Sequence, residues 1–185
     1  MQVNWHAEVS AQLTWYWDHV FRPSLEGLTD EEYLWEPVGN CWTVRPAGNG
    51  AFRCDWSWPT PTPPPFTTIA WRLCHLGANV MGIRANQHFG DGALTIEGIR
   101  WPGRAKDAVD FVEQAYRDWT SGVAALDEAG LARRSGYYEG PFSDQPLATL
   151  VLHVNREVVH HAAGIAQLRE LYRDRRTIIP PPRPH

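Results

Sequence analysis

The sequence has few cysteines and almost no lysine. Its three cysteines, Cys41, Cys54 and Cys74, are odd in number and irregularly spaced, so they support neither a disulfide framework nor a C-x-x-C zinc or redox site. We interpret them as structural thiols in a reducing compartment. Lys106 is the single lysine among the 17 Lys and Arg residues, and this preference for arginine suggests a GC-rich genome such as that of an actinobacterium.

Long apolar runs are also missing. No segment is hydrophobic over the length that a membrane-spanning helix needs. The N-terminal stretch MQVNWHAEVSAQLTWYWDHVF lacks the basic region, the apolar core and the small-residue cleavage site of a secretory signal. We therefore expect a cytoplasmic protein without a membrane partner.

An excess of positive charge is absent as well. The formal net charge is -4 and the pI is near 6.0, so the chain provides no global field that would neutralise nucleic-acid phosphates. The local basic cluster near the end consists of Arg169, Arg173, Arg175 and Arg176. We interpret it as the charge-rich last turn of a helix, where cations are favourable, and not as an RNA-binding patch.

What the sequence does contain indicates a compact domain. Its 185 residues suit a single core, and 43% of them are hydrophobic while 21% are charged. The ten tryptophans supply large apolar surfaces together with indole N–H donors that need partners. Because such surfaces also suit a homodimer interface, the sequence leaves the oligomeric state open.

Apolar residues recur at helical spacing in four long segments, which are residues 4–27, 67–90, 105–127 and 145–175. A short helix is expected between Thr29 and Pro37, and the Pro-rich tail 177–185 cannot continue the last helix. No alternating pattern indicates a sheet. The sequence therefore predicts an all-α protein, a four-helix bundle that forms one domain over residues 1–185.

A long loop rich in Trp and Pro is expected between the first and second long helices. Residues 39–66, GNCWTVRPAGNGAFRCDWSWPTPTPPPF, show no sustained period of 3.6 or 2. The interleaved Trp42, Trp56, Trp58 and Phe66 suggest that the segment packs over something. Two interpretations stay open: a strap across the domain surface, or the wall of a functional pocket.

The segment HVNREVVHHAAGIAQL in the last helix carries a ladder of polar side chains. His153, Glu157 and His161 are each four residues apart and therefore share one helix face, with apolar residues beside them. Two such residues can bind one divalent ion if another helix supplies a third ligand. His75, in the middle of the second long helix, is the histidine placed to do so. Spacing alone equally permits a buried hydrogen-bonded cluster without metal.

Three stretches of the chain resemble the DinB-like superfamily: TIAWRLCHLGANV, GLTDEEYLWEPVGNCWTVRP and LHVNREVVHHAAGIAQLRELY. This superfamily comprises metal-binding four-helix proteins that include bacillithiol transferases and mycothiol-dependent maleylpyruvate isomerases. The resemblance extends from residue 5 to about residue 175. It implies a divalent metal held by His75, Glu157 and His161. Most branches place histidine where this chain has Glu157, so the glutamate is a departure toward the mycothiol-type site.

The resemblance also implies a kind of chemistry. Three protein ligands leave a coordination position open, which is typical of catalytic metals. In thiol-dependent relatives this position receives a thiolate. We therefore expect a metal-dependent enzyme that uses a low-molecular-weight thiol of the mycothiol type for S-transfer or isomerisation of a small molecule. Zinc is the first expectation for the metal, with nickel, iron and manganese as alternatives, and catalytic residues beyond the ligands are unknown.

Other functions remain compatible with the sequence. One is a non-catalytic metal-binding stress-response protein, in which His153 would be a fourth ligand that closes the metal site. Another is a metal-dependent hydrolase, and a third is a metal-free helical interaction module. Asn79, His160 and Arg84 stay outside the predicted site, and Arg84 is interpreted as a solvated helix residue. The chain ends in a Pro-rich tail where mycothiol-dependent isomerases carry a second domain, so the substrate and the thiol do not follow from the resemblance.

Overall fold

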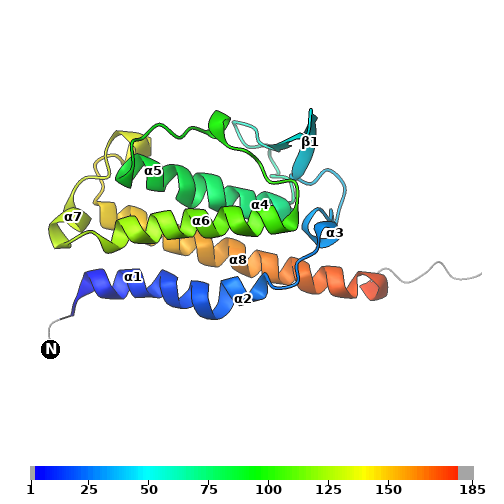
Figure 1. Cartoon of the computed structure of the whole chain (residues 1–185), viewed down its shortest axis with the longest axis horizontal. Helices are drawn as coiled ribbons and strands as arrows, with labels where there is room; N and C mark the ends of the chain where they lie inside the picture. Colours follow the sequence, from blue (N-terminus) through cyan, green and yellow to red (C-terminus); the bar gives the residue numbers. More distant parts are fainter. Residues whose placement is uncertain (1–2, 179–185) are drawn as a thin grey trace, which may run out of the picture.

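A computed structural model describes residues 3–178 of the chain, which is mostly helical. Long helical segments run side by side along the longest axis of the molecule (Figure 1). The first combines α1 (Trp5–Tyr16), η1 (Trp17–Phe21) and α2 (Arg22–Ser24). The second combines α4 (Ile69–His75), η2 (Leu76–Gly82) and α5 (Ile83–Phe89). The others are α6 (Ala105–Ala124) and α8 (Leu147–Ile178), so all four predicted segments are helical.

Side-chain caps begin the first two long segments. The Asn4 side chain accepts a hydrogen bond from the Ala7 N–H (3.1 Å), and the Thr68 hydroxyl accepts one from the Trp71 N–H (3.2 Å). Each cap satisfies a backbone donor that the first helical turn leaves without an intrahelical partner. Thr68 is thus the cap of the helix that carries His75.

The first long segment passes through Pro23 with a local change of helix type. Proline lacks an N–H and its ring collides with the carbonyl four residues earlier in a regular α-helix. Here η1, a wider π-helical turn, ends two residues before the proline, and Phe21 and Trp17 of this turn are buried. The wide turn therefore accommodates Pro23, and the helical segment continues without a break.

The expectation that residues 39–66 contain no regular structure is wrong for part of the segment. Strand β1 (Val44–Gly48) pairs antiparallel with β2 (Ala51–Cys54), and the turn residues Asn49 and Gly50 have φ values of 51° and 75°. Positive φ at both central positions is the requirement of a tight hairpin turn, which Asn-Gly meets. The strands are short and mostly exposed, so they have no alternating apolar pattern.

Backbone hydrogen bonds fasten this hairpin to the start of α4. The Trp42 N–H donates to the Phe66 carbonyl (2.8 Å), and the Thr68 N–H donates to the Trp42 carbonyl (3.1 Å). The Thr68 hydroxyl also donates to the Thr43 hydroxyl (2.9 Å). The two ends of the Trp/Pro segment are thereby held at the N-terminus of the helix that carries His75.

The core lies between the long helices. Helix α6 packs against α4, η2 and α5, while α8 packs against α1, α4 and η2. The Trp17 and Tyr116 rings stack with their centroids 3.9 Å apart, which joins η1 to α6. The largest fully buried side chains are Trp119, Tyr33, Phe21, Ile69, Leu73, Leu76, Met81, Leu147 and Ile165.

Four short helices lie in the connections between the long helical segments. They are α3 (Asp30–Tyr33), η3 (Ile96–Gly98), α7 (Glu128–Ala132) and η4 (Tyr137–Phe142). Thr29 caps α3 as the sequence predicts, because its hydroxyl accepts from the Glu32 N–H (3.2 Å). Helix α3 lies next to the β-hairpin at one end of the molecule (Figure 1).

Arg169 does not belong to a purely surface cluster of arginines. Its guanidinium donates to both carboxylate oxygens of Glu32 (2.9 and 3.3 Å), to the Glu26 carbonyl (2.9 Å) and to the Ser24 carbonyl. Glu32 is 6% exposed, so this ion pair is buried between α8 and α3. The interpretation of this residue as part of the last turn of a helix is wrong, because α8 continues to Ile178.

Within residues 3–178, no helix is both long and apolar enough to cross a membrane. Most of the predicted Pro-rich tail, residues 179–185, lies outside the described part of the chain.

Candidate metal centre

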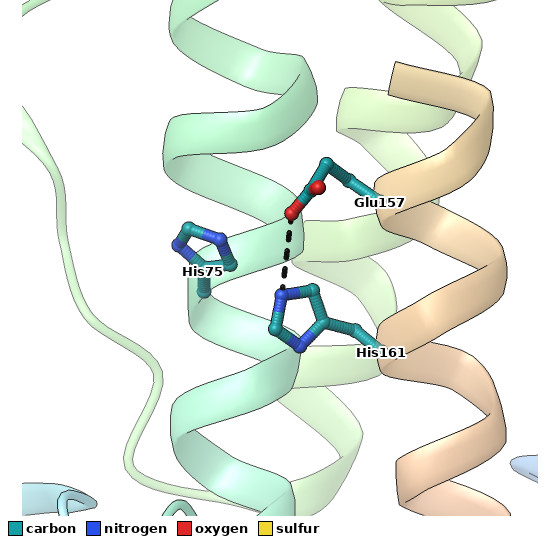
Figure 2. A group of neighbouring side chains, drawn as sticks. All are labelled: His75, Glu157 and His161. Carbon is teal, nitrogen blue, oxygen red and sulfur yellow. Dashed lines mark ion pairs between the residues drawn. The ribbon is translucent and has the colours of Figure 1, made fainter. Parts of the chain in front are cut away.

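The three predicted ligands come together between two helices. His75 is the last residue of α4, and Glu157 and His161 lie one turn apart on α8 (Figure 2). One potential ligand atom from each residue lies within 4.8 Å of the other two. The His75 and His161 ring centroids are 4.8 Å apart at an interplanar angle of 71°. The fold therefore brings together residues 82 positions apart in the sequence into a group that could hold a metal ion.

A wide helical turn begins directly after His75. The π-helical segment η2 follows α4 without a break in the helix, and such turns often occur at functional sites. Gly82 closes this segment, and a Cβ at that position would overlap the Gly77 carbonyl oxygen. The absence of a side chain at Gly82 is therefore a steric requirement of the turn that positions His75.

The variant Gly82→Ala tests this requirement. Alanine would gain about 1 kcal/mol of helix propensity over glycine, whereas the overlap with a backbone oxygen costs about 1–3 kcal/mol. We expect the free energy of unfolding in urea to fall by about 1 kcal/mol, because the steric cost exceeds the gain in propensity. Gly39→Ala, where a Cβ meets nothing within 4 Å, is the matched control. A more stable Gly82→Ala protein would show that η2 does not need this glycine.

The two imidazoles are neutral at pH 7, and each has one nitrogen without a partner. Burial lowers the pKa of His75 to about 4 and that of His161 to about 3. The Nδ1 atoms of both rings are buried without a hydrogen-bond partner. The neutral imidazole is the form that binds metals. Because buried polar atoms in proteins are normally satisfied, these rings fit a site that is completed by a bound group.

The distances inside the group do not describe a hydrogen-bonded cluster. The closest approach of the Glu157 carboxylate to the His161 ring joins Oε2 and Nε2 at 3.6 Å, which is longer than a normal hydrogen bond. The Glu157 side chain is 26% exposed, whereas that of His161 is 11% exposed. A carboxylate facing two neutral imidazoles at this spacing is a donor set that suits a divalent cation.

His153 lies beside this group but does not belong to it. Its Nδ1 atom accepts a hydrogen bond from Nη2 of Arg156 (2.9 Å) and lies 3.9 Å from Oε1 of Glu157. Among the described residues, the group of three gains no fourth His, Cys, Asp or Glu. His160 is exposed, and its ring lies edge-to-face against the His161 ring with centroids 5.0 Å apart.

A cavity of about 350 Å³ opens next to His75. Its wall consists of Cys54, Trp56, Trp71, His75, Asn79, Ile96, Glu97 and Trp101. The Trp71 ring stacks on His75 with centroids 4.8 Å apart, and the Trp56 ring lies 6.4 Å from His75. Of the two interpretations of the Trp/Pro segment, Trp56 fits the pocket wall, whereas Trp58 is 85% exposed.

The comparison with family models identifies a family for this chain. A model of the DinB superfamily matches residues 12–165, a range that contains all three residues of the group and the walls of the cavity. The chain belongs to the DinB superfamily. Comparisons with curated proteins and with solved structures gave no match.

In this DinB superfamily protein the interpretation of Arg84 as a solvated helix residue is wrong. It lies 3.3 Å from the Glu139 carboxylate, which also contacts Nε2 of His88 at 3.0 Å. Burial acts to raise the pKa of Glu139, but His88 and Arg84 together hold that pKa below its usual value. The carboxylate is therefore charged, and this cluster is an ion-paired contact between α5 and η4.

Sequence reasoning missed most of the aromatic wall of the DinB site. Trp71 belongs to α4 and was not assigned a function, although it lies one turn before His75 and therefore on the same helix face. Its indole N–H donates to the Asp55 carbonyl (2.8 Å), which fixes the ring against the Trp/Pro segment. Trp101 and Glu97 come from the connection between α5 and α6, where no sequence pattern indicated a pocket.

Proposed function

We propose that this DinB superfamily protein is a divalent-metal-dependent enzyme that acts on a small molecule, with His75, Glu157 and His161 as the metal ligands in a four-helix bundle. The observation that carries the proposal is the convergence of a carboxylate and two neutral imidazoles with unpartnered Nδ1 atoms, one of which, His75, lines a cavity. A cavity of about 350 Å³ is of the size that accepts a small molecule.

The metal would supply one kind of chemistry here. A divalent ion at these residues would act as a Lewis acid that lowers the pKa of a thiol, so that the thiol reacts as a thiolate at neutral pH. Zinc suits two imidazoles and a carboxylate, and nickel, iron and manganese are the alternatives.

The protein's own residues would prepare the site for that chemistry. Burial keeps His75 and His161 neutral, so their nitrogens are available as donors near pH 7. Glu157 provides a negative charge that offsets part of the charge of a bound cation. The indole rings of Trp56, Trp71 and Trp101 would exclude water from the cavity and contact the apolar part of the substrate.

The proposed reaction is thiol-dependent S-transfer or isomerisation with a thiol of the mycothiol type. In the transfer, the thiolate forms a carbon–sulfur bond with an electrophilic carbon, and the leaving group departs with the electron pair. In the isomerisation, the thiolate adds reversibly to a carbon–carbon double bond. The resulting single bond rotates, and the thiolate then leaves as the double bond forms again. The spacing of Glu157 and His161 and the membership of the DinB superfamily support this proposal.

Conjugation assays would test the function. We expect the zinc-loaded protein to accelerate conjugation of a low-molecular-weight thiol with a small electrophile by at least about tenfold, a modest effect for a lowered thiol pKa. The variant with His75, Glu157 and His161 all replaced by alanine should show the uncatalysed rate. Mass spectrometry of the products distinguishes the alternatives, because a hydrolase would release a product without sulfur. No acceleration of either reaction by the metal-loaded protein would favour a non-catalytic metal-binding function.

Location and assembly are further proposals. Three free thiols, of which Cys41 and Cys74 are buried, support a reducing compartment such as the cytoplasm. Trp5 and Trp15 on α1 are 67% and 60% exposed, and they support α1 as a homodimer interface.

A further inference from the structure

Arg72 lies on the helical rung next to the proposed metal ligands. It is three residues before His75 on α4, and Gly164, which it contacts, is three residues after His161 on α8. Residues three apart share a helix face, so the pair Arg72 and Gly164 adjoins the pair His75 and His161. A Cβ at Gly164 would overlap Nη1 of Arg72. The glycine therefore leaves the space between the helices that the guanidinium occupies.

This guanidinium is half-buried but has no anionic partner. Among residues 3–178, no carboxylate lies within 4.0 Å of it, and its hydrogen bond is a long one from Nε to the Thr67 carbonyl (3.5 Å). A guanidinium has five N–H donors, so most of those on Arg72 are unused. Burial lowers the pKa of Arg72, but the group remains a cation at neutral pH.

Other partly buried arginines in the described chain have partners. Arg22 pairs with Glu113, Arg45 with Glu36 and Asp55, Arg84 with Glu139, and Arg169 with Glu32. Arg175 lies over the Tyr172 ring, 3.6 Å from its centroid. A partly buried arginine is costly unless its charge is compensated. Arg72 departs from this pattern, and it does so three residues from His75, one of the proposed metal ligands.

The charge of Arg72 lies beside the site. Its guanidinium contacts the Gly164 position, three residues after His161, and Arg72 itself is three residues before His75. An anion held between Arg72 and the proposed metal would therefore face two positive centres. A planar carboxylate matches the fork of the guanidinium, which can donate two parallel hydrogen bonds to it.

We propose that Arg72 binds a carboxylate of the molecule that the His75, Glu157 and His161 site receives, which makes the substrate class a carboxylic acid. The inference rests on the proposed function, because it names the substrate class of the same site. The carboxylate belongs either to the thiol or to the electrophile.

Paired small ligands test the proposal in three arms, each followed by NMR titration with the full chain. The ratio of the affinities of metal-free protein for propionate and for propionamide measures carboxylate recognition alone. On zinc-loaded protein, 3-mercaptopropionate against 2-mercaptoethanol tests a carboxylate on the thiol, and 3-chloropropionate against 3-chloropropionamide tests one on the electrophile. We expect the carboxylate to bind about tenfold tighter than its neutral counterpart, the size of a charged hydrogen-bond pair.

The variant Arg72→Met keeps an unbranched apolar stem but removes the guanidinium and its charge, so the carboxylate preference should fall to near unity. Arg72→Lys should retain part of it, because lysine keeps the charge but not the fork. Arg173→Met, at an exposed arginine of the same chain, should leave it unchanged. An equal preference in wild type and Arg72→Met, with both folded by circular dichroism, would overturn the proposal. If zinc does not bind but the propionate arm still depends on Arg72, the metal proposal fails and the assignment of Arg72 stands.

Discussion

Replacing His161 with alanine is expected to abolish metal uptake. The side chain provides one of three converging donors, and it is the most buried of the three. Disturbing only the partners that orient a metal ligand lowers affinity about 10–100-fold, so removing a ligand should lower it by more than about 100-fold. Elemental analysis of protein purified without a histidine tag should therefore give about one equivalent of divalent metal for wild type and none for His161→Ala.

The neighbouring histidine provides a matched control. His160 is exposed and its ring contacts that of His161, but it offers no ligand atom to the group, so His160→Ala should keep its metal. His88 would be a weaker control, because its ring contacts the buried Glu139 and its loss could disturb the fold. Equal metal content in His161→Ala and His160→Ala would contradict the assignment. A wild-type protein that takes up no metal even after dialysis against zinc would refute the site itself.

The substitution Arg169→Met should produce the largest loss of stability. Arg169 compensates the buried carboxylate of Glu32 and also bonds two backbone carbonyls near the end of the first long helical segment. Removing one partner of a buried ion pair leaves an uncompensated charge, which costs about 3–5 kcal/mol. We expect the free energy of unfolding in urea to fall by about 3 kcal/mol or more, with little change in metal affinity.

Arg173→Met separates this effect from a general effect of charge. Arg173 pairs with Asp174 at the surface, where its side chain is 69% exposed, and exposed ion pairs contribute about 0–1 kcal/mol. The double variant Arg169→Met with Glu32→Leu should recover part of the stability, since no unpaired charge then remains. If Arg169→Met and Arg173→Met unfold at the same urea concentration, the buried pair does not hold α8 to α3.

The long helices could be predicted because each has a continuous apolar stripe. Val112, Ala115, Trp119 and Val123 of α6, for example, recur every three or four residues and are all buried. The hairpin at 44–54 has no such signature, because its strands are short and mostly exposed and Pro46 interrupts the first of them. Its one local signal is the Asn49-Gly50 turn, which is weak without an alternating pattern on both sides.

The candidate site could be predicted only in part for a related reason. The ladder of His153, Glu157 and His161 follows from helical spacing, and His75 from its place in the middle of another helix. The resemblance to the DinB-like superfamily was needed to select Glu157 and His161 from the ladder. Arg72 and Trp71 adjoin His75 in sequence, but their contacts depend on Gly164 and Asp55, which are distant along the chain. Whether a charged residue is paired is a property of the tertiary structure, which explains why Arg84 and Arg169 were misinterpreted.

The stacking of Trp71 on His75 gives the protein an optical consequence. Indole emission is sensitive to anything that accepts its excitation energy within a few ångströms, and a paramagnetic ion such as Co²⁺ or Cu²⁺ is an efficient acceptor. An ion bound by His75 and His161 would be adjacent to Trp71, whose ring centroid lies 4.8 Å and 6.1 Å from theirs. The protein thus contains its own fluorophore at the candidate site, and occupancy becomes readable without any added label.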